Sequence, residues 1–262
     1  MADIGLASVI VSVDVAMPDA WDSTATQIER TAGELLHRLN AAGVVATWGL
    51  SDVAHPLGDE IVEQSSHELA MLIGGRVPDT AASYSDFAPE LQRRMNAARM
   101  VGREPTTVHV AAGSNLGQLD VVSKLGINAV RIAPSIALHE SIWQRWFGIG
   151  RAVTNELPHM VRWGVWQFAA HIQVGPTSTG TMQYSIDRAV NGGLPIVAAI
   201  NVAEIAQRSR SGQSAIDAML RHVARRQNEG SLTVQTIDQT VARLSLKHIG
   251  RPSQSILRSR AA

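Results

Sequence analysis

Residues 35–48 read LLHRLNAAGVVATW, and this stretch decides the fold of the chain. Its leucines extend an apolar stripe that begins near residue 26 and keeps to one face of a helix. Gly43 stands where a glycine commonly ends a helix, and the apolar run after it is typical of a buried strand. The stretch therefore predicts a helix that packs on a sheet and leads directly into one of its strands.

The same alternation continues along the chain. We expect strands at 6–13, 44–50, 69–73, 106–110, 129–132, 165–172, 195–202 and 232–234. Helical stripes separate most of them, at about 26–42, 58–67, 86–102, 116–125, 216–223 and 237–244. About eight strands separated by helices predict an α/β protein with a mostly parallel sheet and helices outside it. An open doubly wound sheet and a closed barrel both fit this pattern.

Composition narrows the function classes. The chain has 262 residues, 45% of them hydrophobic and 18% charged, and a formal net charge of zero, so neither nucleic acid nor an anionic membrane is indicated as a partner. It has no cysteine, which excludes disulfides and thiolate metal sites. No apolar stretch approaches the roughly 20 residues that span a bilayer, and residues 4–13 read as a buried strand, so we expect a cytoplasmic protein.

Several segments, taken in order, resemble one enzyme family. Residues 35–48 are similar to the pattern L-L-x-x-L-x-x-x-G-x-x-A-T-F of the polysaccharide deacetylases of the NodB-homology type, carbohydrate esterase family 4. Residues 12–16 (SVDVA) stand where that family has T-F-D-D-G, and residues 66–76 (SHELAMLIGGR) where it has G-H-E-I-G-N-H-[ST]-x-x-H. Residues 108–114 and 164–169 match two later motifs in order.

The resemblance covers about residues 4–245 and implies the family's fold, a distorted (β/α) barrel. We therefore expect a single NodB-like barrel domain over residues 1–248. Residues 249–262 are rich in arginine and serine and lack periodicity, so we expect a solvated C-terminal tail.

The departures from the family pattern fall on its chemistry. The resemblance implies a metal held by one aspartate and two histidines, a second aspartate as base and a late histidine as acid. Only the base position is kept, as Asp14. The three metal-ligand positions, the base-orienting arginine and the late acid motif are replaced by Val15, Leu72, Arg76, His109 and the segment 199–201, which ends in Asn201. We therefore expect neither a metal nor another cofactor.

The remaining residues each allow a functional and a structural interpretation. Asp14 ends the first strand at the carboxyl edge of the sheet, where sites collect in barrels. It is either a hydrogen-bond acceptor for a ligand or a catalytic base, or else it caps a helix or pairs with Arg76. His109 is a second catalytic candidate or a histidine satisfied within the fold. We expect three further side chains at the carboxyl end of the barrel with Asp14 and His109, namely those of Trp48, Trp166 and Asn201. The indoles could stack there on a sugar ring, although tryptophan is more often a core residue.

The other histidines are interpreted structurally. His67 occupies a position that the family also uses structurally, and His222 and His248, on expected helices, are predicted to be solvated.

Two function classes remain. The first is a non-catalytic deacetylase-like protein that binds an oligosaccharide or a protein partner in polysaccharide metabolism, with Trp48, Arg76, Trp166 and Asn201 as binding residues. The second is a metal-independent hydrolase of C–N or ester bonds that uses Asp14 and His109. The hydrolase is favoured if Asp14 and His109 meet within hydrogen-bond reach in an open cleft, and disfavoured if an apolar plug or a salt bridge to Arg76 fills the site. The sequence leaves the oligomeric state open.

Overall fold

The computed structural model describes residues 6–18, 23–64, 66–74, 87–111, 119–133 and 157–249. Arg76 and most of the expected C-terminal tail lie outside these residues, so their predicted roles stay predictions.

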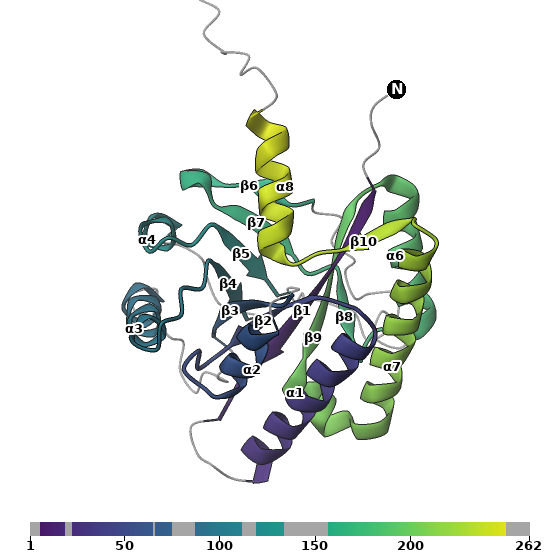
Figure 1. The fold of residues 1–262 in the computed structure, drawn as a ribbon, viewed down its shortest axis with the longest axis horizontal. Helices are drawn as coiled ribbons and strands as arrows, with labels where there is room; N and C mark the ends of the chain where they lie inside the picture. Colours follow the sequence, from purple (N-terminus) through teal and green to yellow (C-terminus); the bar gives the residue numbers. More distant parts are fainter. Residues whose placement is uncertain are drawn as a thin grey trace, which may run out of the picture.

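One sheet forms the centre of the molecule (Figure 1). Its order is β6-β7-β5-β4-β3-β2-β1-β9-β8, and β10 pairs with the first residues of β1. Every pair within it is parallel except β6 with β7. The strands are β1 (Ala7–Val15), β2 (Ala46–Leu50), β3 (Glu68–Ile73), β4 (Thr107–Val110), β5 (Ala129–Ile132), β6 (His159–Met160), β7 (Trp166–Ala169), β8 (Ile172–Val174), β9 (Pro195–Asn201) and β10 (Leu232–Val234).

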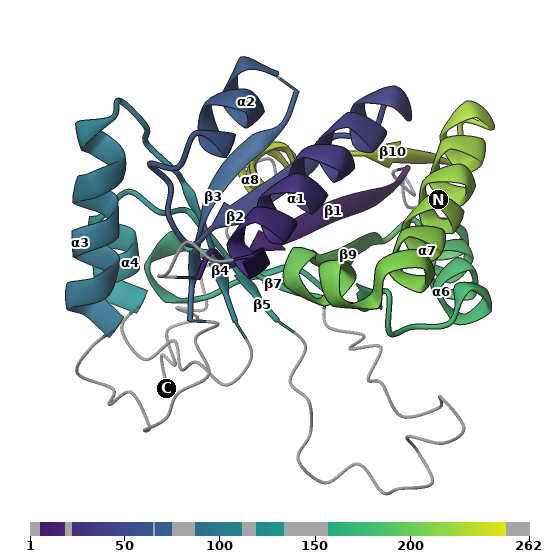
Figure 2. The same ribbon diagram turned by 90° about the horizontal axis from the view of Figure 1, so that it is seen from below.

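Helices surround the curled sheet (Figure 2). They are α1 (Ser23–Ala41), α2 (Leu57–Glu63), α3 (Phe87–Met100), α4 (Leu119–Lys124), α6 (Thr179–Gly192), α7 (Val202–Asn228) and α8 (Ile237–Ile249), with a short 3-10 turn η1 (Arg162–Gly164). Within the described part of the chain, no helix combines the length and hydrophobicity needed to cross a bilayer.

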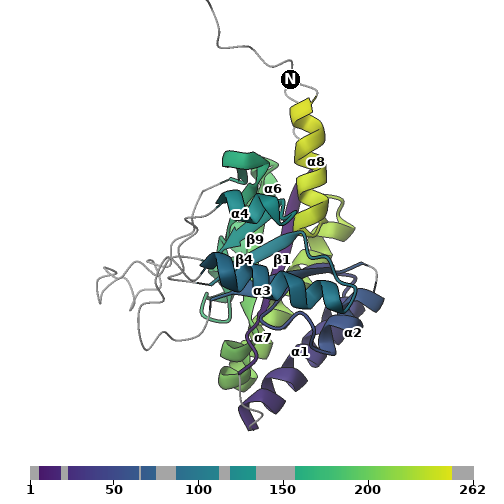
Figure 3. The ribbon, with the colours of Figure 1, turned by 90° about the vertical axis from the view of Figure 1, so that its left-hand side faces the viewer.

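The hydrophobic core has three parts. The outward residues of β1, β2, β8 and β9 pack under α1, α6 and α7, and those of β3, β4 and β5 pack under α3 and α4. The third part fills the inside of the curl, where Phe168 and Val197 meet Ile237 and Val241 of α8. The first turns of α8 therefore close the inside of the curl at the amino ends of β2 and β3, and the far end of the helix projects from the body (Figure 3).

This architecture confirms the predicted distorted (β/α) barrel. It also corrects several element bounds. Helix α1 begins at Ser23, before residue 26, and the expected strand 165–172 is divided into β7 and β8. Helix α7 is far longer than the stripe at 216–223 indicated.

Helix α6 was not expected, because its sequence TGTMQYSIDRAVNG contains few strong helix formers. Capping at both ends of α6 offsets part of this low propensity. The Ser178 hydroxyl accepts the N–H of Thr181 at the start, and Gly193 adopts the left-handed conformation at the end.

Candidate functional site

A polar cluster lies inside the barrel near the carboxyl ends of the central strands. It consists of Ser12 and Asp14 on β1, His109 on β4 and Arg131 on β5. The imidazole Nδ1 of His109 lies 2.8 Å from Asp14 Oδ1, and Arg131 Nη2 donates to the same oxygen. Asp14 retains 13% of its side-chain exposure, whereas the side chains of His109 and Arg131 have none. Asp14 is thus held by two partners from strands far away in the sequence.

Strand geometry explains why these side chains meet. Side chains alternate between the two faces of a strand, so Ser12 and Asp14 share the inner face while Val11, Val13 and Val15 pack outward in the core. His109 is in register with Arg131 on the neighbouring strand. The imidazole lies against Gly49 of β2, where any Cβ atom would overlap the ring. Glycine at this position therefore makes room for the contact between His109 and Asp14.

The hydrogen bonds define the state of the imidazole. A carboxylate can only accept, so Nδ1 of His109 carries the proton that it donates to Asp14. The other ring nitrogen, Nε2, is then an acceptor, and it faces the Ser12 hydroxyl at 3.5 Å. Ser12 is itself completely buried. Both ring nitrogens of His109 consequently point to groups of the barrel interior.

Burial and Arg131 set the protonation of the cluster. Burial, reinforced by the positive charge of Arg131, lowers the pKa of His109 to about 4 against the opposing effect of Asp14. Burial alone would raise the pKa of Asp14, but the Arg131 guanidinium and the His109 hydrogen bond outweigh it and keep that pKa below its usual value. At neutral pH the cluster therefore contains one anion, one cation and a neutral imidazole.

The guanidinium of Arg131 is only partly satisfied. Its Nε and Nη1 atoms are buried and have no hydrogen-bond partner among the described residues. Buried polar groups without a partner are rare in native proteins, because each lost hydrogen bond costs about 1–3 kcal/mol. Arg131 is therefore the member of the cluster with hydrogen-bonding capacity left over.

The residues present do not fit the metal that the family resemblance implies. Val15 is buried in the outer core and Leu72 is buried beside His109, and neither side chain offers a lone pair. Across the described ranges, no three histidine, aspartate or glutamate side chains are grouped as metal ligands. The guanidinium of Arg131, a permanent cation, already contacts the only carboxylate of the cluster.

The two predicted indoles do not form a stacking surface. Trp48 has no exposed surface, because its position on β2 alternates with Gly49 and directs the ring into the outer core. Trp166 is 3% exposed and packs inside the barrel. It begins β7 and so lies at the amino ends of the parallel strands, away from Asp14. The prediction that these indoles stack on a sugar is therefore wrong for this structure.

Asn201 does lie beside the cluster. It is in register with Asp14 on the neighbouring strand β9. Its side-chain oxygen accepts the N–H of Glu204 and so caps the start of α7. The side chain thus has a structural task at the mouth of the barrel.

His67 has the structural role that was predicted for it. Its Nδ1 accepts the N–H of Ala46 at 3.0 Å, and its Nε2 lies 2.9 Å from the Asn40 side-chain oxygen.

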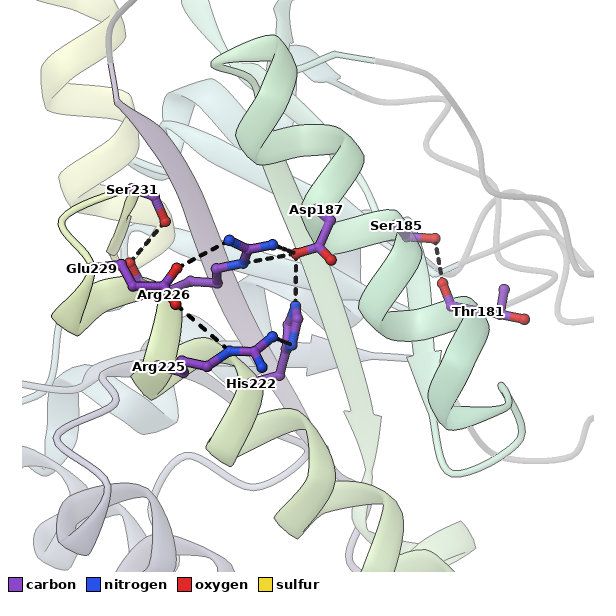
Figure 4. Close-up of polar contacts among 8 residues, drawn as sticks. All are labelled: Thr181, Ser185, Asp187, His222, Arg225, Arg226, Glu229 and Ser231. Atoms are coloured by element: carbon purple, nitrogen blue, oxygen red, sulfur yellow. Dashed lines mark hydrogen bonds and ion pairs between the residues drawn. The ribbon is translucent and has the colours of Figure 1, made fainter.

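A second polar cluster lies outside the barrel, between α6 and α7 (Figure 4). His222 is buried, contrary to the prediction that it is solvated. Its Nε2 lies 2.9 Å from Asp187 Oδ1, and Arg225 lies 3.0 Å from its Nδ1. Arg226 joins Asp187 to Glu229. The apolar stripe of α7 did not reveal that His222 is buried, because α6, which covers His222, was itself not expected.

Sequence reasoning missed Ser12 and Arg131 as site residues. The signal for Arg131 was its place within AVRI, a short apolar strand, because a charged residue is almost never fully buried without a partner. Ser12 carried a weaker signal, its spacing of two residues from Asp14, which puts both on one face.

Comparison with known proteins shows the fold and no more. No protein-family model matches the sequence, and no curated protein matches it significantly. A protein from Mycobacterium smegmatis that is assigned as a polysaccharide deacetylase has a similar structure, with a TM-score of 0.66, 13% identity, and coverage of 95% of this chain and 93% of that one. The allantoinase PuuE gives a TM-score of 0.65 and 9% identity over 95% and 93% of the two chains.

A third structure, a 4-alpha-glucanotransferase from Thermococcus litoralis, is similar over 91% of this chain and 40% of its own length, with a TM-score of 0.60 and 10% identity. The resemblance to the polysaccharide deacetylases, first drawn from short motifs, is therefore confirmed at the level of the fold. The names of these three proteins describe three different activities, so the fold alone does not decide the reaction.

Proposed function

We propose that the protein is a non-catalytic relative, in fold, of the polysaccharide deacetylases and binds a glycan at the carboxyl end of its barrel. One observation carries this proposal: both nitrogens of His109 and the Oδ1 atom of Asp14 are engaged inside the barrel, with Arg131 as the counter-charge. A base needs a free lone pair within reach of the substrate, and the Nε2 lone pair of His109 faces buried Ser12 instead.

The electrostatics support the same conclusion. Hydrolysis of an amide needs a group that stabilises the developing oxyanion and a group that activates water. Within the cluster, the cation is paired with the only carboxylate, and the imidazole is enclosed. Because Arg131 and Asp14 hold each other in place, we infer that this end of the barrel binds a ligand by shape and hydrogen bonds and does not transfer a proton to it.

Calorimetry with N-acetylated chitotriose tests the binding half of the proposal. We expect a saturable heat with wild-type protein and no change in the oligosaccharide afterwards. Arg93→Gln, on the exposed face of α3, serves as a control that should bind equally. Absence of heat at millimolar oligosaccharide would exclude this ligand and leave a protein partner as the occupant.

A metal-independent hydrolase is the second candidate. The 2.8 Å contact between Asp14 and His109 favours it, because a carboxylate that holds one imidazole nitrogen can direct the other toward a reaction. It predicts that purified protein releases acetate from chitotriose and that His109→Gln abolishes this release. A cytoplasmic location and a single domain over residues 1–248 are further predictions that none of these observations tests, and the oligomeric state, monomer or homo-oligomer, stays open.

A further inference from the structure

We propose that the partly satisfied guanidinium of Arg131 is a binding site for a carboxylate group of the ligand, which points to an acidic sugar or a small carboxylic acid. The inference rests on the proposed function in one respect, since it assigns the ligand to the same end of the barrel. It begins with the buried nitrogens Nε and Nη1 of Arg131, which have no partner among the described residues.

The geometry of the guanidinium selects the ligand group. An arginine has five N–H donors in a planar fork, arranged as two edges that each present a parallel pair. Asp14 accepts from Nη2 through a single oxygen, Oδ1, which also accepts from His109. One edge of the fork therefore keeps both of its N–H groups. A carboxylate satisfies such an edge with two hydrogen bonds, whereas a hydroxyl or an amide carbonyl satisfies it with one acceptor atom.

The position of Arg131 makes this edge relevant to a ligand. Arg131 is the last but one residue of β5, and its side chain reaches from there to Asp14 near the end of β1. It thus crosses the barrel interior close to the carboxyl ends of the strands, where ligands of parallel α/β barrels bind. Asp14, which is 13% exposed, marks the approach from solvent.

Charge balance gives the site a second property. The cluster is neutral when His109 is neutral, so a bound carboxylate would leave one uncompensated negative charge in a buried place. Among the described residues, the groups that face the His109 ring are Asp14, Ser12 and Arg131. The ring and the Asp14 carboxylate can both take up a proton, and Arg131 holds the pKa of Asp14 below its usual value, so the Nε2 atom of His109, which faces only the neutral Ser12 hydroxyl, is the better acceptor. We therefore expect carboxylate binding to be coupled to uptake of one proton by His109, so that the affinity rises as the pH falls.

Calorimetry with three probes, glucuronate, glucose and acetate, tests this site at pH 5.5 and 7.5. We expect glucuronate to bind, glucose to bind more weakly or not at all, and the glucuronate affinity to be higher at pH 5.5. Titrations in two buffers of different ionisation heat should reveal about one proton taken up per ligand. Acetate that binds as tightly as glucuronate would assign the site to small acids and would count against a sugar ligand.

Two variants keep the test independent of folding. Arg131→Gln should weaken glucuronate binding by roughly ten- to a hundredfold, the effect of losing hydrogen bonds to a charged group. Because that variant could unfold, Asp14→Asn provides a second arm: it removes the competing carboxylate, so glucuronate and acetate should bind more tightly and should raise the melting temperature of the variant. Arg93→Gln, which changes an exposed arginine of α3, should behave as wild type.

The outcomes separate this inference from the proposed function. Binding of neutral chitotriose with no binding of either carboxylate by wild type or Asp14→Asn would overturn the carboxylate site and leave the glycan proposal standing. Binding of acetate alone would support the site and contradict the glycan. If Asp14→Asn gains no affinity for carboxylates, Arg131 is a purely structural counter-ion and the inference is wrong.

Discussion

At the scale of single residues, Arg131 changes what the end of the barrel can do. Its guanidinium contacts Asp14 at the place where the family resemblance implies an acidic residue beside a metal. The predicted counter-charge was Arg76, which lies outside the described residues, and the structure places a different arginine on the carboxylate. The predicted pairing with Arg76 and the observed pairing with Arg131 have the same physical reason. A largely buried aspartate that has no metal beside it requires another cation.

The pKa of His109 makes stability depend on pH. The imidazole has a pKa of about 4 in the folded protein and its ordinary value of 6.5 when unfolded. The unfolded chain therefore binds the proton first, so this stabilisation is present above pH 6.5 and is lost as the pH falls toward 4, by about 3 kcal/mol in all. Urea unfolding of wild type between pH 7.5 and 4.5 should show this loss.

The matched variant His109→Gln isolates that contribution. It has no titrating group at this position, so its stability should fall less steeply over the same pH range. His67, whose pKa is also lowered by burial, adds a slope of the same sign in both proteins. Parallel curves for the two proteins would show that His109 is not held neutral in the folded state.

Gly49 should be intolerant of a side chain. Gly49→Ala places a Cβ atom against the buried imidazole of His109, which has no room to retreat, and we expect a loss of about 1–3 kcal/mol. Gly33→Ala is the control, since its Cβ in α1 meets no atom within 4 Å and should stabilise by about 0.5–1 kcal/mol. Thermal unfolding of both variants decides the matter, and equal effects would contradict the close packing at Gly49.

At the scale of elements, Asn201 at the end of β9 caps the long helix α7. Asn201→Ala should cost about 1 kcal/mol, because the N–H of Glu204 loses its acceptor. Asn201→Ser restores a capping oxygen and should recover most of that loss. Chemical denaturation measures both. If alanine and serine are equally destabilising, the side chain of Asn201 contributes through something other than the cap.

The elements also show how far sequence patterns reach. Strand β5 was predicted with its observed bounds, because AVRI is short, apolar and closed by loops, yet the same pattern hid the fact that its arginine enters the interior. Helix α6 was not predicted because its intrinsic propensity is low; its caps and the packing of Met182, Ile186 and Ala189 in the core hold it. His222 was misjudged in consequence, since burial depends on a helix that local periodicity did not reveal.

The candidate site was predictable only in part. Asp14 and His109 could be placed together because both end strands of a parallel sheet, where carboxyl ends converge. Trp48 and Trp166 were misplaced because a side chain reaches the site only from the inner face of a strand and near its carboxyl end. Trp48 lies on the outer face of β2, and Trp166 lies at the amino end of β7. A one-residue step turns a side chain to the opposite face, and motif spacing alone does not resolve that step.

At the scale of the whole molecule, we predict that no metal is bound at the end of the barrel. Val15 and Leu72 offer no ligand atom, and Arg131 repels a cation. Elemental analysis of protein purified without chelators should find well below one transition metal per chain, and added zinc should not raise the melting temperature. A stoichiometric metal that stabilises the protein would refute this prediction.

The three similar structures have names that describe different activities, so the chemistry has to be measured on this protein. The most direct measurement is acetate release from N-acetylated chitotriose, followed over hours at pH 7.5 with and without added zinc. A non-catalytic barrel predicts no acetate above the level in buffer under either condition. Acetate formed in proportion to protein concentration, and lost in His109→Gln, would contradict it.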